Sequence, residues 1–252
     1  MIDASRYVAE RKFALRVLSF YVTLIPPDDE AAAPDLGGKL FYAGELDDDG
    51  CAWIVAANIA GAASLCGSSN ALAPKQAIRD GIIDFLVTSL DEAVRILKNE
   101  VRKHAPAAVC IGAPPAEIEE QMSERGVAPD IVRPGGGTAG NSSPAFDDIA
   151  LVSWSVSSAP ARWMPKLDAF ALECGGELLQ GTRRWLQMSP RYLGRLAQSI
   201  HLVLADRAFA TRFMENAMAL EGGNIPVKLQ VTYRGGGEEF NAPNWNKDDP
   251  DT

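Results

Sequence analysis

The 252-residue sequence is poor in the residues that build metal and redox sites. It has two histidines, and its four cysteines show no C-x-x-C spacing. A zinc site needs several cysteine or histidine ligands at short spacings, and a redox motif needs two close cysteines. We therefore expect free, mostly buried thiols and no metal site. A catalytic pair of cysteine and histidine has no local motif to support it.

The sequence also lacks a long apolar run and an excess of basic residues. Its longest apolar stretch, residues 51–67, includes Asn58 and Ser64 and is shorter than a bilayer span. The first twenty residues carry several charges, so we expect no signal peptide. The formal net charge of −9 argues against nucleic acid, because phosphate binding needs clustered lysine and arginine. We expect a cytoplasmic protein with neither a membrane nor a nucleic-acid partner.

The sequence does contain a regular alternation of apolar segments and amphipathic helices. The helix at 90–104 is well marked, because Ser89 and Glu92 match a capping box and apolar residues follow on one face. Strands and helices that alternate at this spacing predict an α/β fold, a doubly wound parallel sheet with helices on both faces. We expect strands near 39–43, 62–66, 82–87, 107–111 and 129–133, and helices at 51–60, 74–80, 90–104 and 115–125.

The pattern changes on both sides of this α/β region. We divide the chain into an N-terminal helix and loop, an α/β domain, an α+β C-terminal region and a loose polar tail, at residues 1–34, 35–148, 149–234 and 235–252. The C-terminal region is predicted to be mainly helical, with strands near 149–156 and 225–234 and two or three helices across 165–218. One of these helices starts at Pro190 and has an apolar stripe of Leu193, Leu196, Ile200, Val203 and Leu204.

Three turns that follow strand ends are candidates for a ligand site. In open parallel sheets, ligands bind in the crevice beyond the carboxyl ends of the strands. The turns are residues 44–50, 67–70 and 135–143, and residues 112–117 close the side. The candidate ligand-binding residues are Gly44, Asp48, Asp49, Gly50, Ser68, Ser69, Asn70, Gly112, Glu117, Thr138, Asn141 and Ser142.

The first turn is acidic, although this position holds phosphate in many α/β proteins. Residues 27–50 carry eight acidic residues and one basic residue, and Asp47, Asp48 and Asp49 are adjacent. Backbone N–H groups at a helix start attract anions, but three carboxylates repel a phosphate. Aspartate also caps and solvates a helix start, and carboxylates bind hard cations. Capping is therefore one alternative, and a cation site without the ligand spacing of a calcium loop is another.

Residues 35–133 resemble the central Rossmann-like, cofactor-binding domain of urocanase (urocanate hydratase). The clearest matching segments are SLDEAVRI at 89–96, GAPPAEIEEQMSERGVAPDIV at 112–132 and AANIAG at 56–61. The resemblance implies a doubly wound fold that holds a tightly bound NAD. In the family, NAD serves as an electrophile for the addition of water to urocanate.

The functional positions depart from the family at every point. The glycine-rich pyrophosphate turn is replaced by the acidic turn, and no acidic residue between Asp49 and Asp80 is available for the ribose hydroxyls. The loop after residue 132 has no histidine, where the family has a Gln-Thr-Ser-Ala-His run. The family's cysteine-bearing catalytic segment has no counterpart. The polar groups that remain are Ser68, Ser69, Asn70, Thr138, Asn141 and Ser142.

We therefore predict a divergent urocanase-like protein that binds a small molecule at the strand ends without full urocanate hydratase activity. The sequence identifies no catalytic residue. No cofactor is expected, and NAD is the alternative that the resemblance implies. Two other functions stay open: a lyase of the urocanate hydratase type that uses NAD in an unusual mode, and a structural or assembly protein. A homodimer is an open alternative for the oligomeric state.

Overall fold

The computed structural model describes residues 4–26, 35–134, 149–156, 159–175, 180–197, 199–219 and 227–233. The chain divides into two compact units. The parallel-sheet unit comprises Arg16–Asn141 and Arg191–Arg195. The antiparallel-sheet unit comprises Met1–Leu15, Ser142–Pro190 and Leu196–Thr252. Two of the boundaries fall inside α-helices, α1 (Ala4–Leu24) and α7 (Gln180–Leu193).

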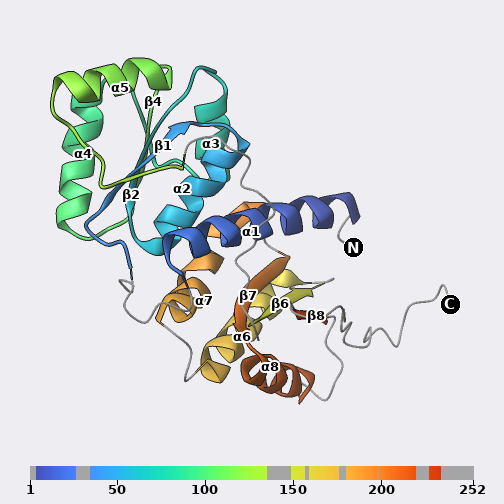
Figure 1. Ribbon diagram of the computed structural model, residues 1–252. Helices are drawn as coiled ribbons and strands as arrows, with labels where there is room; N and C mark the ends of the chain where they lie inside the picture. Colours follow the sequence, from blue (N-terminus) through green and yellow to red (C-terminus); the bar gives the residue numbers. More distant parts are fainter. Residues whose placement is uncertain are drawn as a thin grey trace. The chain divides into compact units, whose positions relative to one another are not determined.

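The parallel-sheet unit confirms the predicted doubly wound sheet. Its five strands pair in parallel in the order β3-β4-β2-β1-β5. They are β1 (Leu40–Glu45), β2 (Ala63–Gly67), β3 (Phe85–Val87), β4 (Ala108–Ile111) and β5 (Ile131–Val132). Helices α4 (Leu90–Arg102) and α5 (Pro115–Glu124) cover one face of the sheet, and α2 (Asp48–Ala60) and α3 (Ala73–Asp80) cover the other (Figure 1).

The strand order creates a topological switch point between β2 and β4. These strands are neighbours, but the chain leaves β2 into α3 on one face and leaves β4 into α5 on the other. Ligands of open α/β sheets bind where neighbouring connections diverge in this way. The turns after β2 and β4 are therefore the first place to examine for a site, together with the adjacent turn after β1.

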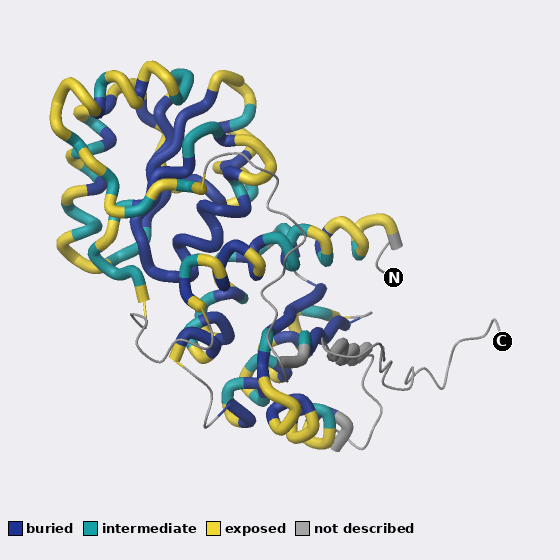
Figure 2. The backbone as a smooth tube through the Cα atoms, viewed as in Figure 1, coloured by how far each residue is buried: buried dark blue, intermediate teal, exposed yellow. Residues whose placement is uncertain are grey.

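Helix α2 lies in the interior of the parallel-sheet unit. Almost every residue from Gly50 to Ala60 is buried, as the dark tube in Figure 2 shows. Trp53 of α2 stacks on Phe20 of α1, with ring centroids 4.2 Å apart, and on Phe41 of β1, 5.9 Å away. Burial of each large apolar side chain contributes about 1.5–3 kcal/mol. Helix α2 is therefore packed against both α1 and β1.

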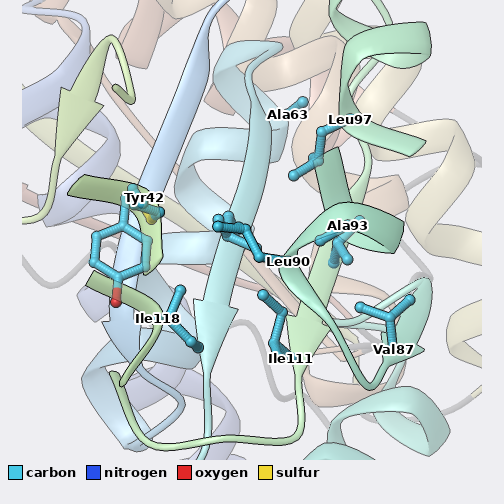
Figure 3. Packing of buried hydrophobic residues seen from close by; sticks show 11 residues of the cluster. Tyr42, Ala63, Val87, Leu90, Ala93, Leu97, Ile111 and Ile118 are labelled. Carbon is cyan, nitrogen blue, oxygen red and sulfur yellow. The ribbon is translucent and has the colours of Figure 1, made fainter. Parts of the chain in front are cut away.

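The opposite face of the sheet has its own apolar core (Figure 3). Leu90, Ala93 and Leu97 of α4 pack on the strands beside Ile118 of α5. Helix α4 begins where predicted, because the Ser89 hydroxyl oxygen accepts a hydrogen bond from the Glu92 N–H at 3.3 Å. Helical spacing thus places one apolar stripe on the sheet and leaves charged residues on the other side of α4.

The antiparallel-sheet unit combines a three-stranded sheet with helices. Strand β6 (Ile149–Val156) pairs with β7 (Ile200–Asp206) on one side and β8 (Val227–Tyr233) on the other. Helices α6 (Pro160–Cys174), α7 and α8 (Arg207–Ala219) complete the unit. Its core includes Trp154, whose indole lies 4.9 Å from the Phe213 ring. No helix in the described part of the chain is both long and apolar enough to cross a membrane.

The predicted helix from Pro190 is wrong. Helix α7 ends at Leu193, a 3-10 turn covers Gly194–Leu196, and the rest of the supposed stripe lies in β7. Strand β7 pairs with β6 at seven successive positions, from Ile149–Asp206 to Ser155–Ile200. The apolar run is compatible with both a helical stripe and a buried strand. Pairing and side-chain packing with β6 stabilise the strand.

Candidate ligand site at the strand ends

The acidic turn after β1 caps α2 with its first aspartate. The Asp47 carboxylate accepts a hydrogen bond from the Gly50 N–H at 2.5 Å, and the Asp47 backbone is extended, as an N-cap requires. The capping alternative is therefore confirmed for Asp47. Helix α2 begins at Asp48 rather than at residue 51, because the cap starts it one turn earlier. A carboxylate of the protein thus lies where the start of α2 would hold an anion.

Two arginines bind the same turn. The Arg133 guanidinium donates to the Asp47 carboxylate at 3.0 Å and lies 3.9 Å from the Asp49 carboxylate. Arg16 of α1 lies 3.2 Å from the other oxygen of Asp49. Arg16 and Arg133 are thus both paired with carboxylates of this turn. Asp48 is exposed and has no ionic or hydrogen-bonded partner among the described residues.

Gly50 permits the close approach of α2 to β1. A Cβ atom at this position would lie 2.1 Å from the Glu45 carbonyl oxygen, far inside van der Waals contact. The nearby Gly44 is half-buried, at an irregularity in the pairing of β1 with β2. The two predicted glycines therefore border the acidic turn, and Gly50 lets the backbone at the start of α2 lie against the backbone of Glu45.

The ends of β1 and β2 are joined by Glu45. Its carboxylate accepts hydrogen bonds from the Ser69 N–H at 3.0 Å and from the Ser69 hydroxyl at 2.8 Å. The backbone adds a second link, from the Leu46 N–H to the Gly67 carbonyl at 2.8 Å. The first two predicted turns therefore lie side by side, with the Ser69 hydroxyl engaged by Glu45.

The switch point between β2 and β4 is filled by the protein. The Ser68 N–H donates to the Ala113 carbonyl at 2.9 Å, and a Cβ atom on Gly67 would lie 2.5 Å from the Ile118 side chain. Ser68 is only 4% exposed, and its hydroxyl donates to the Asn70 carbonyl at 3.0 Å. The turns after β2 and β4 are therefore packed directly against each other, and Ser68 is engaged within the protein.

Among the predicted site residues that the structure describes, three have polar side chains that remain open. Asp48 follows β1, Asn70 follows β2 and Glu117 lies in the first turn of α5; all three are exposed. The Asn70 amide oxygen accepts from the Leu72 N–H at 2.9 Å, which leaves the amide nitrogen without a partner among the described residues. Gly112 is exposed beside them. The open groups thus comprise two carboxylates and one amide donor. The predicted Thr138, Asn141 and Ser142 lie outside the described residues.

The thiols and the tyrosine near this edge stay protonated at neutral pH. Burial, followed by the charges of Asp48 and Asp47, raises the pKa of the Cys51 thiol to about 12. Burial beside Cys110 also raises the pKa of Cys66. Burial and Glu119 raise the pKa of Tyr42, whose hydroxyl donates to the Glu119 carboxylate at 3.2 Å. A nucleophilic cysteine needs a lowered pKa, so these thiols are not activated.

Within the described ranges, no three histidine, cysteine, aspartate or glutamate side chains converge closely enough to hold a metal ion. Asp47 instead caps α2 and pairs with Arg133, Asp49 pairs with Arg16, and Asp48 is exposed. Sequence reasoning missed the two arginine contacts and the Glu45–Ser69 link. Their partners are far apart in the chain, and no local signal connects them.

Residues 20–135 match the family model of the urocanase Rossmann-like domain. The matched segment covers just under half of the 252-residue chain and includes all five parallel strands. It also includes the acidic turn and Arg133, and it begins within α1, ahead of the segment in which the sequence motifs lie. The resemblance of this central segment to urocanase is therefore confirmed.

Proposed function

We propose that the parallel-sheet unit is a urocanase-type domain that has exchanged dinucleotide binding for a small, neutral or cationic polar ligand. The chain does not hydrate urocanate in this proposal. The observation that carries it is the place of Asp47. Its carboxylate accepts hydrogen bonds from the Gly50 N–H at the start of α2 and from the Arg133 guanidinium, two groups that would otherwise attract a phosphate.

Electrostatics oppose a pyrophosphate at this turn. Two like charges 4 Å apart repel by about 1 kcal/mol in water and about 4 kcal/mol near a protein surface. A pyrophosphate at the start of α2 would meet Asp47, Asp48 and Asp49 together. It would also have to compete with Asp47 for Arg133. The same carboxylates attract a cationic group.

The exposed groups of the edge support a cationic or neutral ligand. Asp48 and Glu117 carry negative charge into solvent, and the Asn70 amide offers a donor. An ammonium or guanidinium group would pair with the carboxylates, and a hydroxyl or carbonyl would accept from Asn70. We therefore assign ligand binding to Asp48, Asn70 and Glu117, and support of the turns to Glu45, Gly50 and Ser68.

A second candidate is a lyase of the urocanate hydratase type that uses NAD. The family match of residues 20–135 favours it. It requires the acidic turn to accept a pyrophosphate, or the dinucleotide to lie in another mode. NAD that stays bound through purification would support this candidate. An assembly protein, the third alternative, would show neither a retained ligand nor turnover.

The test uses the purified full-length chain. Native mass spectrometry and an absorbance spectrum would show a co-purified ligand, and the loss of urocanate absorbance would measure hydration. A panel of small amines, guanidinium compounds and polyols would then be screened by thermal shift. We expect no urocanate turnover and a raised melting temperature with at least one cationic compound. The shift should disappear in Asp48→Asn with Glu117→Gln and persist in Asp91→Asn with Glu124→Gln, a pair outside the site.

Urocanate loss that scales with protein, and that is absent from a mock purification, would contradict the proposal. So would retained NAD. A thermal shift that persists in the Asp48→Asn and Glu117→Gln variant would move the ligand to another part of the molecule.

A further inference from the structure

Helix α4 carries a basic stripe on the side turned away from its core contacts. Arg95, Lys98 and Arg102 lie at successive turns, and all three are exposed. Among the described residues, none of them has a hydrogen-bonded or ionic partner. By contrast, the neighbouring Lys103 is paired with Glu100 at 2.8 Å. Three unpaired cations on one helix stand out in a chain with a net charge of −9.

A hollow of about 630 Å³ runs along this stripe. Its apolar lining is Val94 and Val101, which are half-buried against the core of the sheet. Its charged lining is the three bases, with Asp91 at one end, where Arg125 pairs with that aspartate. The hollow thus has apolar and basic lining residues, and the negative charge of Asp91 at one end is neutralised by Arg125.

The hollow is open to solvent, and the residues that line it follow the axis of α4, so an elongated ligand fits them. The residues that line it extend from Asp91 to Arg102, which at 1.5 Å per residue is about 16 Å along the axis. From Arg95, the other two cations lie about 4.5 and 10.5 Å further along. In an extended chain, side chains on one face repeat every 6–7 Å, so two or three acidic residues can reach these cations.

We propose that this stripe of α4 is a docking site for an acidic peptide segment of a partner protein. Its carboxylates pair with Arg95, Lys98 and Arg102, and an apolar side chain packs on Val94 and Val101. Charge complementarity selects this occupant. A short peptide responds mainly to charges within about 8 Å at physiological salt, so the stripe outweighs the distant acidic residues. A long nucleic acid would also meet the negative field of the rest of the chain.

The experiment measures fluorescence anisotropy of labelled Glu-Glu-Phe-Glu-Glu with the full-length chain. Gln-Gln-Phe-Gln-Gln is the uncharged control peptide. The test variant carries Lys98→Glu and Arg102→Glu. The matched control carries Lys75→Glu and Arg79→Glu, the same two residue types at the same spacing on α3, which covers the other face of the sheet. Circular dichroism melts verify that each variant folds.

We expect the acidic peptide to bind, and the Lys98 and Arg102 variant to weaken it about tenfold or more through lost attraction and new repulsion. Raising NaCl from about 0.1 to 1 M should also weaken it, because the screening length falls from about 10 to 3 Å. Equal loss in both variants, equal binding of the glutamine peptide, or tighter binding of a single-stranded RNA would overturn the proposal. So would no binding of the acidic peptide at about 0.1 M salt.

Discussion

The Arg133 guanidinium lies 3.0 Å from the Asp47 carboxylate, although 86 residues separate the two in the chain. Asp47 ends the turn after β1, and Arg133 directly follows β5, the neighbouring strand. The same carboxylate accepts the Gly50 N–H at the start of α2. One aspartate therefore occupies two of the groups that an incoming phosphate would use at the start of α2.

Removal of the Asp47 charge should create an anion site. Serine retains a good N-cap, so Asp47→Ser leaves α2 capped and frees Arg133. We expect calorimetry to detect no micromolar binding of NAD or pyrophosphate to the wild-type chain, and measurable pyrophosphate binding to Asp47→Ser. When Asp48→Gly and Asp49→Gly are combined with Asp47→Ser, we expect NAD to bind as well. Asp91→Ser, on α4, is the control and should bind neither. Micromolar NAD affinity in the wild-type chain would refute the electrostatic account.

Gly50→Ala should strongly destabilise the parallel-sheet unit. Its Cβ atom would lie 2.1 Å from the Glu45 carbonyl oxygen, so the backbone must move. We expect a loss of about 3 kcal/mol in the free energy of unfolding, measured with chemical denaturant. Gly112→Ala is the control, because its nearest neighbour would be 3.9 Å from the added Cβ. That variant should lie within about 0.5 kcal/mol of wild type, and equal losses would mean that close packing is not the cause.

Alkylation of Cys51 should be slow at pH 8. With a pKa of about 12, about one Cys51 thiol in ten thousand is ionised there, against about one in four for an ordinary cysteine of pKa about 8.5. The rate with iodoacetamide, followed by peptide mass spectrometry, should keep rising with pH as the thiolate forms. Asp48→Asn should lower the pKa and accelerate alkylation at pH 8, whereas Asp91→Asn should not. Rapid, complete labelling of wild-type Cys51 at pH 8 would contradict the raised pKa.

Asp130→Asn should destabilise the sheet in a pH-dependent way. The Asp130 carboxylate accepts from the Leu40 N–H at 2.8 Å and from Lys39 at 3.3 Å, and these contacts lower its pKa, the Leu40 N–H most. A lowered pKa in the folded state stabilises the protein above the unfolded pKa of about 3.9, and this is lost as pH falls through the folded value.

We therefore expect wild type to exceed Asp130→Asn by about 1 kcal/mol in unfolding free energy at pH 7, a value reduced for the partial exposure of the carboxylate. The difference should shrink below pH 4 in denaturant titrations. Lys39→Gln, which removes only the salt bridge, should cost less. A difference that stays constant from pH 7 to pH 2 would show that the charge of Asp130 is not involved.

Local patterns were sufficient for most of the parallel-sheet unit. The five parallel strands were predicted near their observed positions, because burial and capping signals there agree with the fold. Local patterns failed at β7, where the apolar run is compatible with both an amphipathic helix and a buried strand. The predicted site was partly assembled by the structure: the turns after β1 and β2 meet through Glu45 and Ser69. Ser68, also predicted to bind a ligand, is turned into the protein.

The sequence by itself determined that the central segment is a parallel α/β domain that resembles the urocanase Rossmann-like domain, and that its first turn is acidic. Periodicity, capping and motif spacing are local properties of the chain, so they are visible without a structure. Only the tertiary structure decided what the acidic turn does. The pairing of Asp47 with Arg133 and of Asp49 with Arg16 depends on strand order and on the packing of α1 over α2. Those distances are set by the burial of many side chains together, which no short stretch of sequence specifies.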